Sequence, residues 1–466
     1  MHDTRLKRTL GHFAFAGLTL TTLGLAACGG SGGGGTSSAG CTTPNGKTAS
    51  SGSQLAAMLG SQGLAAARPV AAAKVPSAGK NLVIATELPV VGTDASVGLP
   101  TQYGTDLAVS QNADLGGGYT LTVQHENYAG ANGPDTGIAT TSVQKLASDP
   151  NVIAAVGPFN SGIAKVTIPI SNNAGLVFIS PANTNPGLTK EQFAAANSIN
   201  FQTLHPAGKP NAYFRVPGTD DVQGKVDAQI ASQTLGCKTA FVVDDNSVYG
   251  KGLADFFTTN FKSNGGTTVG SRQSITAQQV SNLGSLADTI KNANPDVVFY
   301  GGITSGGGGA LKKALVDKGF NHPMVGGDGI ANDSNFLTTA STDAAVNTWG
   351  TVAAPDLSAL TSAAATKFST DYKAFVAGKP NNTLYNYSAM SYDCAMIEIT
   401  AIKNVIASGQ PVTRDSVRAE VQKINFAGIT GQISFDANGD NSGPKVFAVY
   451  SVDSSKNWVY KQQLNG

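Results

Sequence analysis

Two loops in the first half of the chain carry side chains suited to holding a small ligand. Residues 152–156 and 176–179 are short apolar runs, and each stops at a polar loop rich in Gly, Pro and Asn. Such runs suit strands covered on both faces, and parallel sheets bind ligands beyond the carboxyl ends of their strands. Ser161 and Thr184 lie in these loops, so we expect their hydroxyls to meet a small molecule.

Ser161 also stands at the start of a predicted helix. Together with Asn160 it would place a helix N-terminus and a hydroxyl beside an anion. The alternative is that Ser161 only caps its own helix. On the neighbouring loop, residues 181–184 present main-chain groups and the hydroxyl of Thr184. A carboxylate would then be bound through dipoles and neutral donors, without an arginine.

The common catalytic constellations are not apparent in the sequence. The pattern G-x-S-x-G occurs only at residues 29–33, in a Gly-rich stretch rather than at a strand-to-helix turn. The glycine run 306–309 precedes a predicted helix, but no Gly-Lys-Ser/Thr follows, so a flexible loop is favoured over a phosphate cradle. The five histidines show no metal-ligand spacing. We therefore expect no enzyme activity, no cofactor and no metal.

The charge balance gives no reason to expect nucleic acid as a partner. The chain has 31 Lys and Arg against 30 Asp and Glu, a net charge of +1. Charged residues make up 13% of the chain, against about 25% in an average soluble domain, so Ser, Thr, Asn and Gln supply much of the surface. The length of 466 residues favours two lobes, because single cores stop growing at about 250–300 residues.

The N-terminus is predicted to be an export signal, residues 1–27. Three basic residues precede an apolar segment over residues 13–27, which is too short to span a membrane stably, and small residues lead to Cys28. Cys28 stands where bacterial lipoprotein signals place their lipidated cysteine, and the resemblance implies cleavage before it. The alternative is a soluble secreted protein. Residues 28–79 are rich in Gly, Ser and Ala and are predicted to form a flexible tether.

Three further cysteines occur, at Cys41 in the predicted tether and at Cys237 and Cys394 in the body. Their different contexts argue against a structural disulfide, although an exported protein meets an oxidising environment. Cys237 and Cys394 are predicted to be buried free thiols, and the state of Cys41 is left open.

From residue 81 onward, strand-like and helix-like segments alternate. This alternation predicts βαβ units and an α/β fold with parallel sheets. The expected strands are residues 81–86, 119–126, 152–156, 176–179, 213–216, 238–244, 267–275, 296–301, 323–327 and 445–452. The expected helices are residues 102–113, 135–148, 250–265, 282–293, 310–318, 360–377 and 389–408. Residues 189–211 lack a pattern and are predicted to cross the surface.

Several short markers follow one another through residues 80–452. They are Val156-Gly157 with Ser161, Ile179 to Thr184, Phe214-Arg215 with Asp220 and Gln223, Tyr249 to Gly252, Gly326 to Gly329, Tyr392-Asp393 and the closing Gly431 to Asp440. Their order and spacing resemble the extracellular ligand-binding receptors exemplified by the Leu/Ile/Val-binding proteins of bacterial ABC importers. The resemblance implies the type I periplasmic binding protein fold, two Rossmann-like lobes joined by three hinge crossings. The expected lobes are residues 80–218 with 352–444, and residues 219–351 with 445–466.

The resemblance also implies ligand-binding roles. Ser161 and Thr184 match hydroxyls that hold the α-carboxylate and ammonium of an amino acid, and Ala182 matches a residue that offers main-chain groups. Tyr249 matches an aromatic residue that covers the ligand from the opposite lobe. Asp328 falls where the family commonly has an acidic residue, often a glutamate, paired with the α-ammonium; an unpaired ammonium in a closed site would be costly. The alternative for Asp328 is a turn aspartate between glycines.

Other positions depart from the family pattern and bear on specificity. Ile303 follows the strand where leucine-type binders often place a tyrosine against the ligand's side chain. Asn160 stands at one place of a cysteine pair that some members carry. Tyr103 and Tyr385 are further candidates for lining the pocket, with the lobe core or the surface as the alternative for each.

These observations together lead to a functional hypothesis. The chain is expected to be a monomeric, lipid-anchored substrate-binding protein in the periplasm or on the outer face of the cytoplasmic membrane. It would capture a small amino acid, branched-chain or aliphatic, and deliver it to an ABC transporter permease and its ATPase. The alternatives are a sensory ligand-binding module, an enzyme on the same fold, and a binding protein for an aromatic acid or a urea-like amide.

Overall fold

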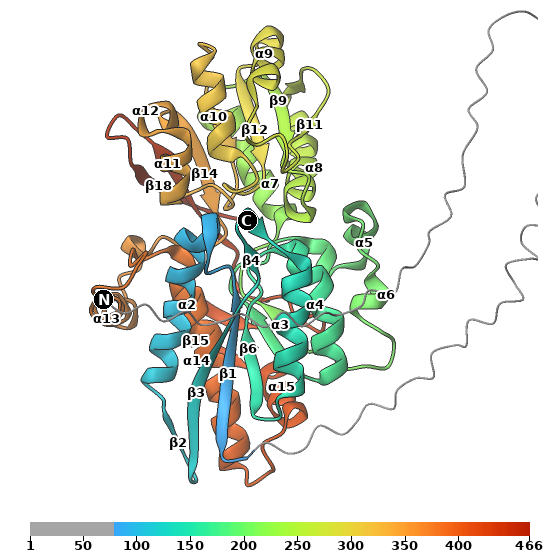
Figure 1. Ribbon diagram of the computed structural model, residues 1–466, viewed down its shortest axis with the longest axis vertical. Coiled ribbons are helices and arrows are strands. Elements are labelled where there is room, and N and C mark those ends of the chain that lie inside the picture. The colour runs from blue at the N-terminus through green and yellow to red at the C-terminus, as the bar shows by residue number, and fades with distance from the viewer. Residues whose placement is uncertain (1–78) are drawn as a thin grey trace, which may run out of the picture. The chain divides into compact units, whose positions relative to one another are not determined.

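The computed structural model describes residues 79–466. The predicted export signal and tether, with Cys28 and Cys41, lie outside these residues. The described chain forms two α/β lobes, each built on its own largely parallel sheet (Figure 1). The predicted fold class of two Rossmann-like lobes is therefore confirmed.

The first lobe is built on a six-stranded sheet in the order β2, β3, β1, β6, β7, β8. All neighbouring strands are parallel except β2 and β3. Helices α2, α14 and α15 pack on one face, and α3 and α4 on the other. The strands are Asp114–Gly116 (β2), Tyr119–Asn127 (β3), Asn81–Leu88 (β1), Val152–Val156 (β6), Val177–Ser180 (β7) and Tyr213–Arg215 (β8). The helices are Ala95–Ser110 (α2), Thr136–Ser148 (α3), Ser161–Ala174 (α4), Asn386–Ala407 (α14) and Arg414–Gln422 (α15).

The second lobe is built on an eight-stranded sheet in the order β10, β9, β12, β13, β14, β17, β18, with β11 also paired to β9. Only β17 and β18 run antiparallel to their neighbours. The strands are Thr267–Thr268 (β10), Thr239–Asp244 (β9), Val297–Gly301 (β12), Met324–Gly326 (β13), Thr348–Val352 (β14), Val446–Val452 (β17), Trp458–Asn465 (β18) and Gln273–Ser274 (β11). The helices are Asp220–Gln229 (α7), Val248–Ser263 (α8), Gly284–Ala293 (α9), Gly308–Asp317 (α10), Ser334–Ala340 (α11) and Thr342–Ala345 (α12).

Smaller elements complete the chain. Two hairpins pair Ala129–Gly130 (β4) with Gly133–Pro134 (β5), and Asn425–Gly428 (β15) with Gly431–Ser434 (β16). Ala363–Phe375 (α13) packs beside α2. The segment predicted to cross the surface without a pattern contains two short helices, Glu191–Ala194 (α5) and Phe201–Leu204 (α6).

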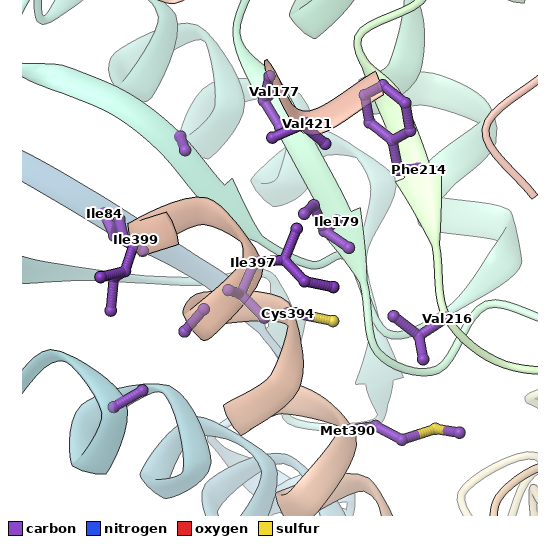
Figure 2. Close-up of a cluster of buried hydrophobic side chains, with 14 of the residues drawn as sticks. Ile84, Val177, Ile179, Phe214, Val216, Met390, Cys394, Ile397, Ile399 and Val421 are labelled. Atoms are coloured by element: carbon purple, nitrogen blue, oxygen red, sulfur yellow. The ribbon is translucent and has the colours of Figure 1, made fainter. Parts of the chain in front are cut away.

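Successive side chains of the central strands point to opposite faces of the sheet, and helices bury them on both faces. In β12, Val297 and Phe299 pack toward α7 and α8, whereas Val298 and Tyr300 pack toward α9 and α10. Continuous apolar runs of this kind are typical of central parallel strands. Figure 2 shows the first-lobe core, where Ile397 and Cys394 of α14 lie near Ile179 of β7. Cys394 and Cys237 are both free and buried, as predicted.

The predicted strand over residues 267–275 is wrong as a single element. The structure has two short strands, β10 and β11, with Gly270 between them at a φ of +70°. A side chain at Gly270 would also approach the Phe241 ring, with a contact of 2.6 Å. The chain bends here around Phe241, so pairing with β9 is interrupted and then resumes.

The chain passes between the lobes three times, after β8, after β14 and before β17. A buried ion pair fixes the chain near two of these passages, because Arg215 Nε lies 2.7 Å from Asp440 Oδ1 and Arg215 is fully buried. The guanidinium also donates to Asn185 O at 2.6 Å and to the hydroxyl of Thr189. The precise lobe boundaries proposed from the sequence stay a prediction.

Candidate functional site

A small cavity lies where the two lobes meet at the carboxyl ends of their strands. It measures about 20 Å³ and brings together seven residues selected from the sequence with Phe159 and Gly329. Those seven are Asn160, Ser161, Ala182 and Thr184 of the first lobe and Tyr249, Ile303 and Asp328 of the second. A cavity of this size holds about one water molecule. An amino acid can enter only if the lobes separate.

The loop after β6 presents the start of α4 to this cavity. Asn160 is the residue before the helix, but its side chain caps no helical N–H and instead accepts a hydrogen bond of 2.8 Å from the Tyr128 hydroxyl. Ser161 is the first helical residue, and its hydroxyl accepts a long bond of 3.4 Å from Asn185 N. Ser161 therefore does not cap its own helix, so its hydroxyl can face a ligand together with the helix N-terminus.

The loop after β7 is held by Ser180. The Ser180 hydroxyl donates to Pro158 O at 2.7 Å and accepts from the backbone N–H groups of Ala182 and Asn183, at 3.2 and 2.9 Å. The N–H of Ala182, expected to be available to a ligand, is thus bonded within its own loop. Thr184 is buried, its carbonyl accepts from Asp220 N at 2.8 Å, and its hydroxyl lies close enough to Asp220 to lower the pKa of that carboxyl.

Asp328 follows β13 and carries the principal charge of the cavity. Its Oδ1 accepts a hydrogen bond of 2.9 Å from the Tyr249 hydroxyl, and its Oδ2 accepts one of 2.7 Å from the Tyr387 hydroxyl. Burial raises the pKa of Asp328, while Tyr387, Tyr249 and Gln223 oppose that rise. The bond from Tyr387 also links the lobes, since Tyr387 belongs to α14 of the first lobe and Asp328 to the second. Asp328 therefore does more than shape a turn.

Tyr387 and Gln223 were not predicted to take part. Tyr387 stands two residues after Tyr385, which the sequence did suggest, and the rings of the two tyrosines lie edge to face at 5.5 Å. Tyr385 itself is buried behind this contact, and its hydroxyl has no partner among residues 79–466. The pattern Tyr-x-Tyr at the start of a helix could have drawn attention to Tyr387. The sequence alone does not determine which of the two rings faces Asp328.

Tyr103 lies apart from the cavity. It packs in a cluster with Phe368 and Tyr372, and its hydroxyl donates to Pro380 O at 3.0 Å. Because α2 buries this face against α13, the structure places Tyr103 with the lobe core, the alternative given for it, rather than with the other candidates.

Several hydrogen bonds join the lobes around the cavity. Asn185 Nδ2 donates to Val248 O at 3.0 Å on one side. On the other side, the Ser96 hydroxyl donates to Asp333 Oδ1 at 2.8 Å, and Asp333 O accepts from the Trp458 indole at 3.0 Å. Separation of the lobes would break the first two bonds. The arrangement is therefore a closed one.

A wider hollow of about 430 Å³ adjoins the cavity and shares Asn160, Ser161, Tyr249 and Ile303 with it. The first turn of α4 and the loop before α8 form its walls. It lies on the side of the cavity where Ser161 stands.

Carboxyl groups dominate the surroundings of the cavity. Asp220 is fully buried, and neither of its oxygens has a hydrogen-bond partner within the described part of the chain. Burial raises its pKa, and the charge of Asp328 raises it further. No Lys or Arg lines the cavity among the residues described. The site therefore favours a ligand that brings a positive charge.

Neither a metal centre nor a membrane span is evident in residues 79–466. No group of three or more His, Cys, Asp and Glu side chains there is arranged to hold a metal ion. None of the helices in the same residues has the length and apolarity that a bilayer crossing requires.

Comparisons with known proteins give consistent results. The sequence profile described as periplasmic binding protein matches residues 82–457. The Leu/Ile/Val-binding protein BraC3 of Rhizobium johnstonii is 30% identical over 59% of this chain and 68% of its own length. The branched-chain amino acid transporter substrate-binding protein LivJ of Streptococcus pneumoniae, solved with isoleucine, superposes with a TM-score of 0.68 at 24% identity, over 83% of this chain and all of that one. A solute-binding protein of R. palustris solved with benzoate gives 0.64 at 20% identity, over 82% and 96%.

Proposed function

The chain belongs to the periplasmic binding protein family, and from this premise we propose that it captures a small α-amino acid between its lobes and delivers it to an ABC transporter. Proteins of this family bind substrates for transporters and work outside the cytoplasm. The observation that carries the choice of an amino acid is Asp328, a buried carboxylate of the cavity whose hydrogen-bond donors there are phenols rather than a cation. An α-ammonium would supply the missing positive charge.

In this proposal the first lobe holds the ligand's carboxylate. The N-terminus of α4 and the hydroxyls of Ser161 and Thr184 supply a dipole and neutral donors. Tyr249 and Asp328 then engage from the second lobe. Because these contacts exist only when the lobes are together, the ligand shifts the equilibrium toward the closed form. The closed form would be what the permease recognises.

Branched-chain or aliphatic amino acids are the first ligands to test, because BraC3 is named for leucine, isoleucine and valine and LivJ was solved with isoleucine. Anchoring through a lipid on Cys28 is part of the same proposal and rests on the lipoprotein-like signal alone. A monomeric state at the membrane surface is a separate part of the proposal.

An amine-free acid is the second candidate, since a protein of similar fold was solved with benzoate. Asp328 discriminates between the two, because a buried carboxylate repels an acid that brings no ammonium. A sensory role would use the same closure without a permease, and a transporter operon beside the gene would count against it.

A thermal-shift screen of the full chain tests the proposal. The panel holds the twenty amino acids, aromatic acids and amides, and a ligand at a hundredfold excess over Kd stabilises by about 2.7 kcal/mol. We expect shifts with amino acids only. Asp328→Asn should weaken their binding by roughly 3–5 kcal/mol, whereas Asp288→Asn, an exposed control in the same lobe, should not. Retained amino-acid affinity in Asp328→Asn, or shifts confined to amine-free acids, would overturn the assignment.

A further inference from the structure

A second cavity of about 20 Å³ adjoins the one that holds Asp328. The two share Phe159, Asn160, Ile303, Asp328 and Gly329 as lining residues. The second cavity also reaches Pro89, Asp94 and Val97 of the first lobe and Thr304 and Asp333 of the second. Like the first, it is formed by both lobes and exists only while they are together.

Asp94 is the unusual residue in this second cavity. It is only 6% exposed, yet its buried Oδ2 accepts no hydrogen bond from any residue in the range 79–466. Asp94 stands at the N-cap position of α2, where an aspartate usually bonds a helical N–H, but its side chain makes no such bond. Its burial is therefore not explained by helix capping.

The neighbouring groups leave Asp94 unsatisfied. The Ser305 hydroxyl lies close enough to lower the pKa of Asp94 but does not reach hydrogen-bond geometry, and it too lacks a partner among the described residues. Asp333 and Asp245 are nearby carboxyl groups and, after burial itself, raise the pKa of Asp94 to about 6. A buried carboxylate without a donor is costly, so a donor arriving with the ligand would relieve that cost.

The other two carboxylates of this cavity already have donors. Asp328 is bonded by two phenols, and Asp333 accepts from the Ser96 hydroxyl at 2.8 Å and from Asn335 N at 2.9 Å. No lysine or arginine lines the cavity among the residues described. Asp94 is thus the carboxylate left for the ligand.

The second cavity also lies where a ligand's side chain would go. Ser161, Ala182 and Thr184, which would face the α-carboxylate, line only the first cavity, whereas Asp328 lines both. An amino acid with its carboxylate at Ser161 and its ammonium at Asp328 therefore directs its side chain away from α4. That direction leads past Phe159 and Ile303 to Asp94.

We propose that Asp94 is a specificity-determining residue that binds a cationic nitrogen on the ligand's side chain, so that the site prefers a short diamino acid to its aliphatic isostere. This rests on the proposed amino-acid binding function and narrows its ligand class. The apolar walls at Pro89, Val97 and Phe159 would contact the methylene groups, and Asp94 would bond the terminal nitrogen.

The test compares 2,4-diaminobutyrate with norvaline, which differ by an ammonium in place of a methyl group. Titration calorimetry on the full chain measures both at pH 7.5. We expect diaminobutyrate to bind at least about tenfold more tightly, the size of effect of one hydrogen bond to a charged group. In Asp94→Asn this preference should fall about tenfold or more, while the affinity for norvaline changes by less than about threefold.

One control variant and one replacement variant keep the test decisive. Asp106→Asn removes a largely covered carboxyl group from α2, beside His125 and away from both cavities, and should leave the preference intact. If Asp94→Asn does not fold, as judged by its melting curve, Asp94→Ser replaces it.

The inference is overturned if norvaline binds as tightly as diaminobutyrate, or if the preference survives loss of Asp94. When norvaline or leucine binds and depends on Asp328 without such a preference, only this inference fails. When neither diaminobutyrate, norvaline nor any other amino acid binds, the proposed function fails and this inference with it.

Discussion

At the scale of single residues, the site depends on how one buried carboxylate is held. Burial raises the pKa of Asp328, and hydrogen bonds from two phenols and from Gln223 reduce that rise by stabilising the ionised form. The phenols come from different lobes, Tyr249 from α8 and Tyr387 from α14. Both hydrogen bonds therefore hold the carboxylate, and the one from Tyr387 forms only when the lobes are closed.

Tyr387→Phe should lower the free energy of unfolding by roughly 1.5–3 kcal/mol, because the mutation removes a hydrogen bond to a charged group. Tyr385→Phe is the matched control. Its hydroxyl is buried and has no partner among the described residues, so its loss should be neutral or stabilising. Urea denaturation of the two variants provides the comparison. Equal losses in both would contradict the role given to Tyr387.

The sequence predicted the residues that lie directly after strands. Ser161, Thr184 and Asp328 follow apolar runs, and the carboxyl ends of parallel strands meet at one edge, so they come together. Tyr387 and Asp94 escaped prediction because each reaches the site from a helix start distant in the sequence. Only tertiary packing decides that their side chains point to it.

At the scale of elements, the first lobe depends on the close approach of α2 to α14. A side chain at Gly104 of α2 would place its Cβ 2.1 Å from Ser388 O of α14. Because Gly104 has no side chain, the two helices can touch at Ser388. Tyr387 lies one residue before this contact and is positioned by it. A tight helix pair thus supports the binding site.

Gly104→Ala should destabilise the protein by roughly 1–3 kcal/mol, because extra volume forces packed helices apart. Gly162→Ala on α4 serves as its control, since nothing lies within 4 Å of a Cβ there and alanine favours helix. Thermal unfolding of both variants measures the difference. A Gly104→Ala variant as stable as the parent would mean that α2 can shift freely.

Element boundaries were predicted best where apolar runs are bounded by turn residues. The predicted strand at residues 152–156 matches β6, whereas β18 and α15 were not anticipated. β18 is an edge strand with exposed polar residues, and α15 is a short, mostly polar helix, so neither contains an apolar run that marks it in the sequence. Such elements are fixed by the partners they pack on.

At the scale of the whole molecule, buried carboxyl groups set the response to pH. The pKa values of Asp94 and Asp393 rise to about 6 and that of Asp106 to about 7, mainly through burial. An acid with a raised pKa in the folded state binds its proton more readily there than in the unfolded chain, so it adds stability as the pH falls. His125 and His205, whose pKa values are lowered, oppose this by smaller shifts.

The ligand-free protein should therefore gain stability as the pH is lowered from 8 to 5. One carboxyl group with a folded pKa near 6 contributes on the order of 1 kcal/mol over this range. Below pH 4 the trend should reverse, because the pKa of Asp440 is lowered by Arg215 and that ion pair is lost on protonation. Urea denaturation across this range measures the profile. Asp393→Asn should flatten it, and a profile that falls steadily from pH 8 to 5 would contradict the assignment.

The hydrogen bond between the Trp458 indole and Asp333 O has a practical consequence. The chain contains only two tryptophans, and Asp333 also bonds Ser96 across the lobes. When the lobes part, the polarity around this indole changes, so its ultraviolet emission should shift. Tryptophan fluorescence should therefore report closure of the lobes. Rapid-mixing fluorescence could then time ligand capture without an attached dye.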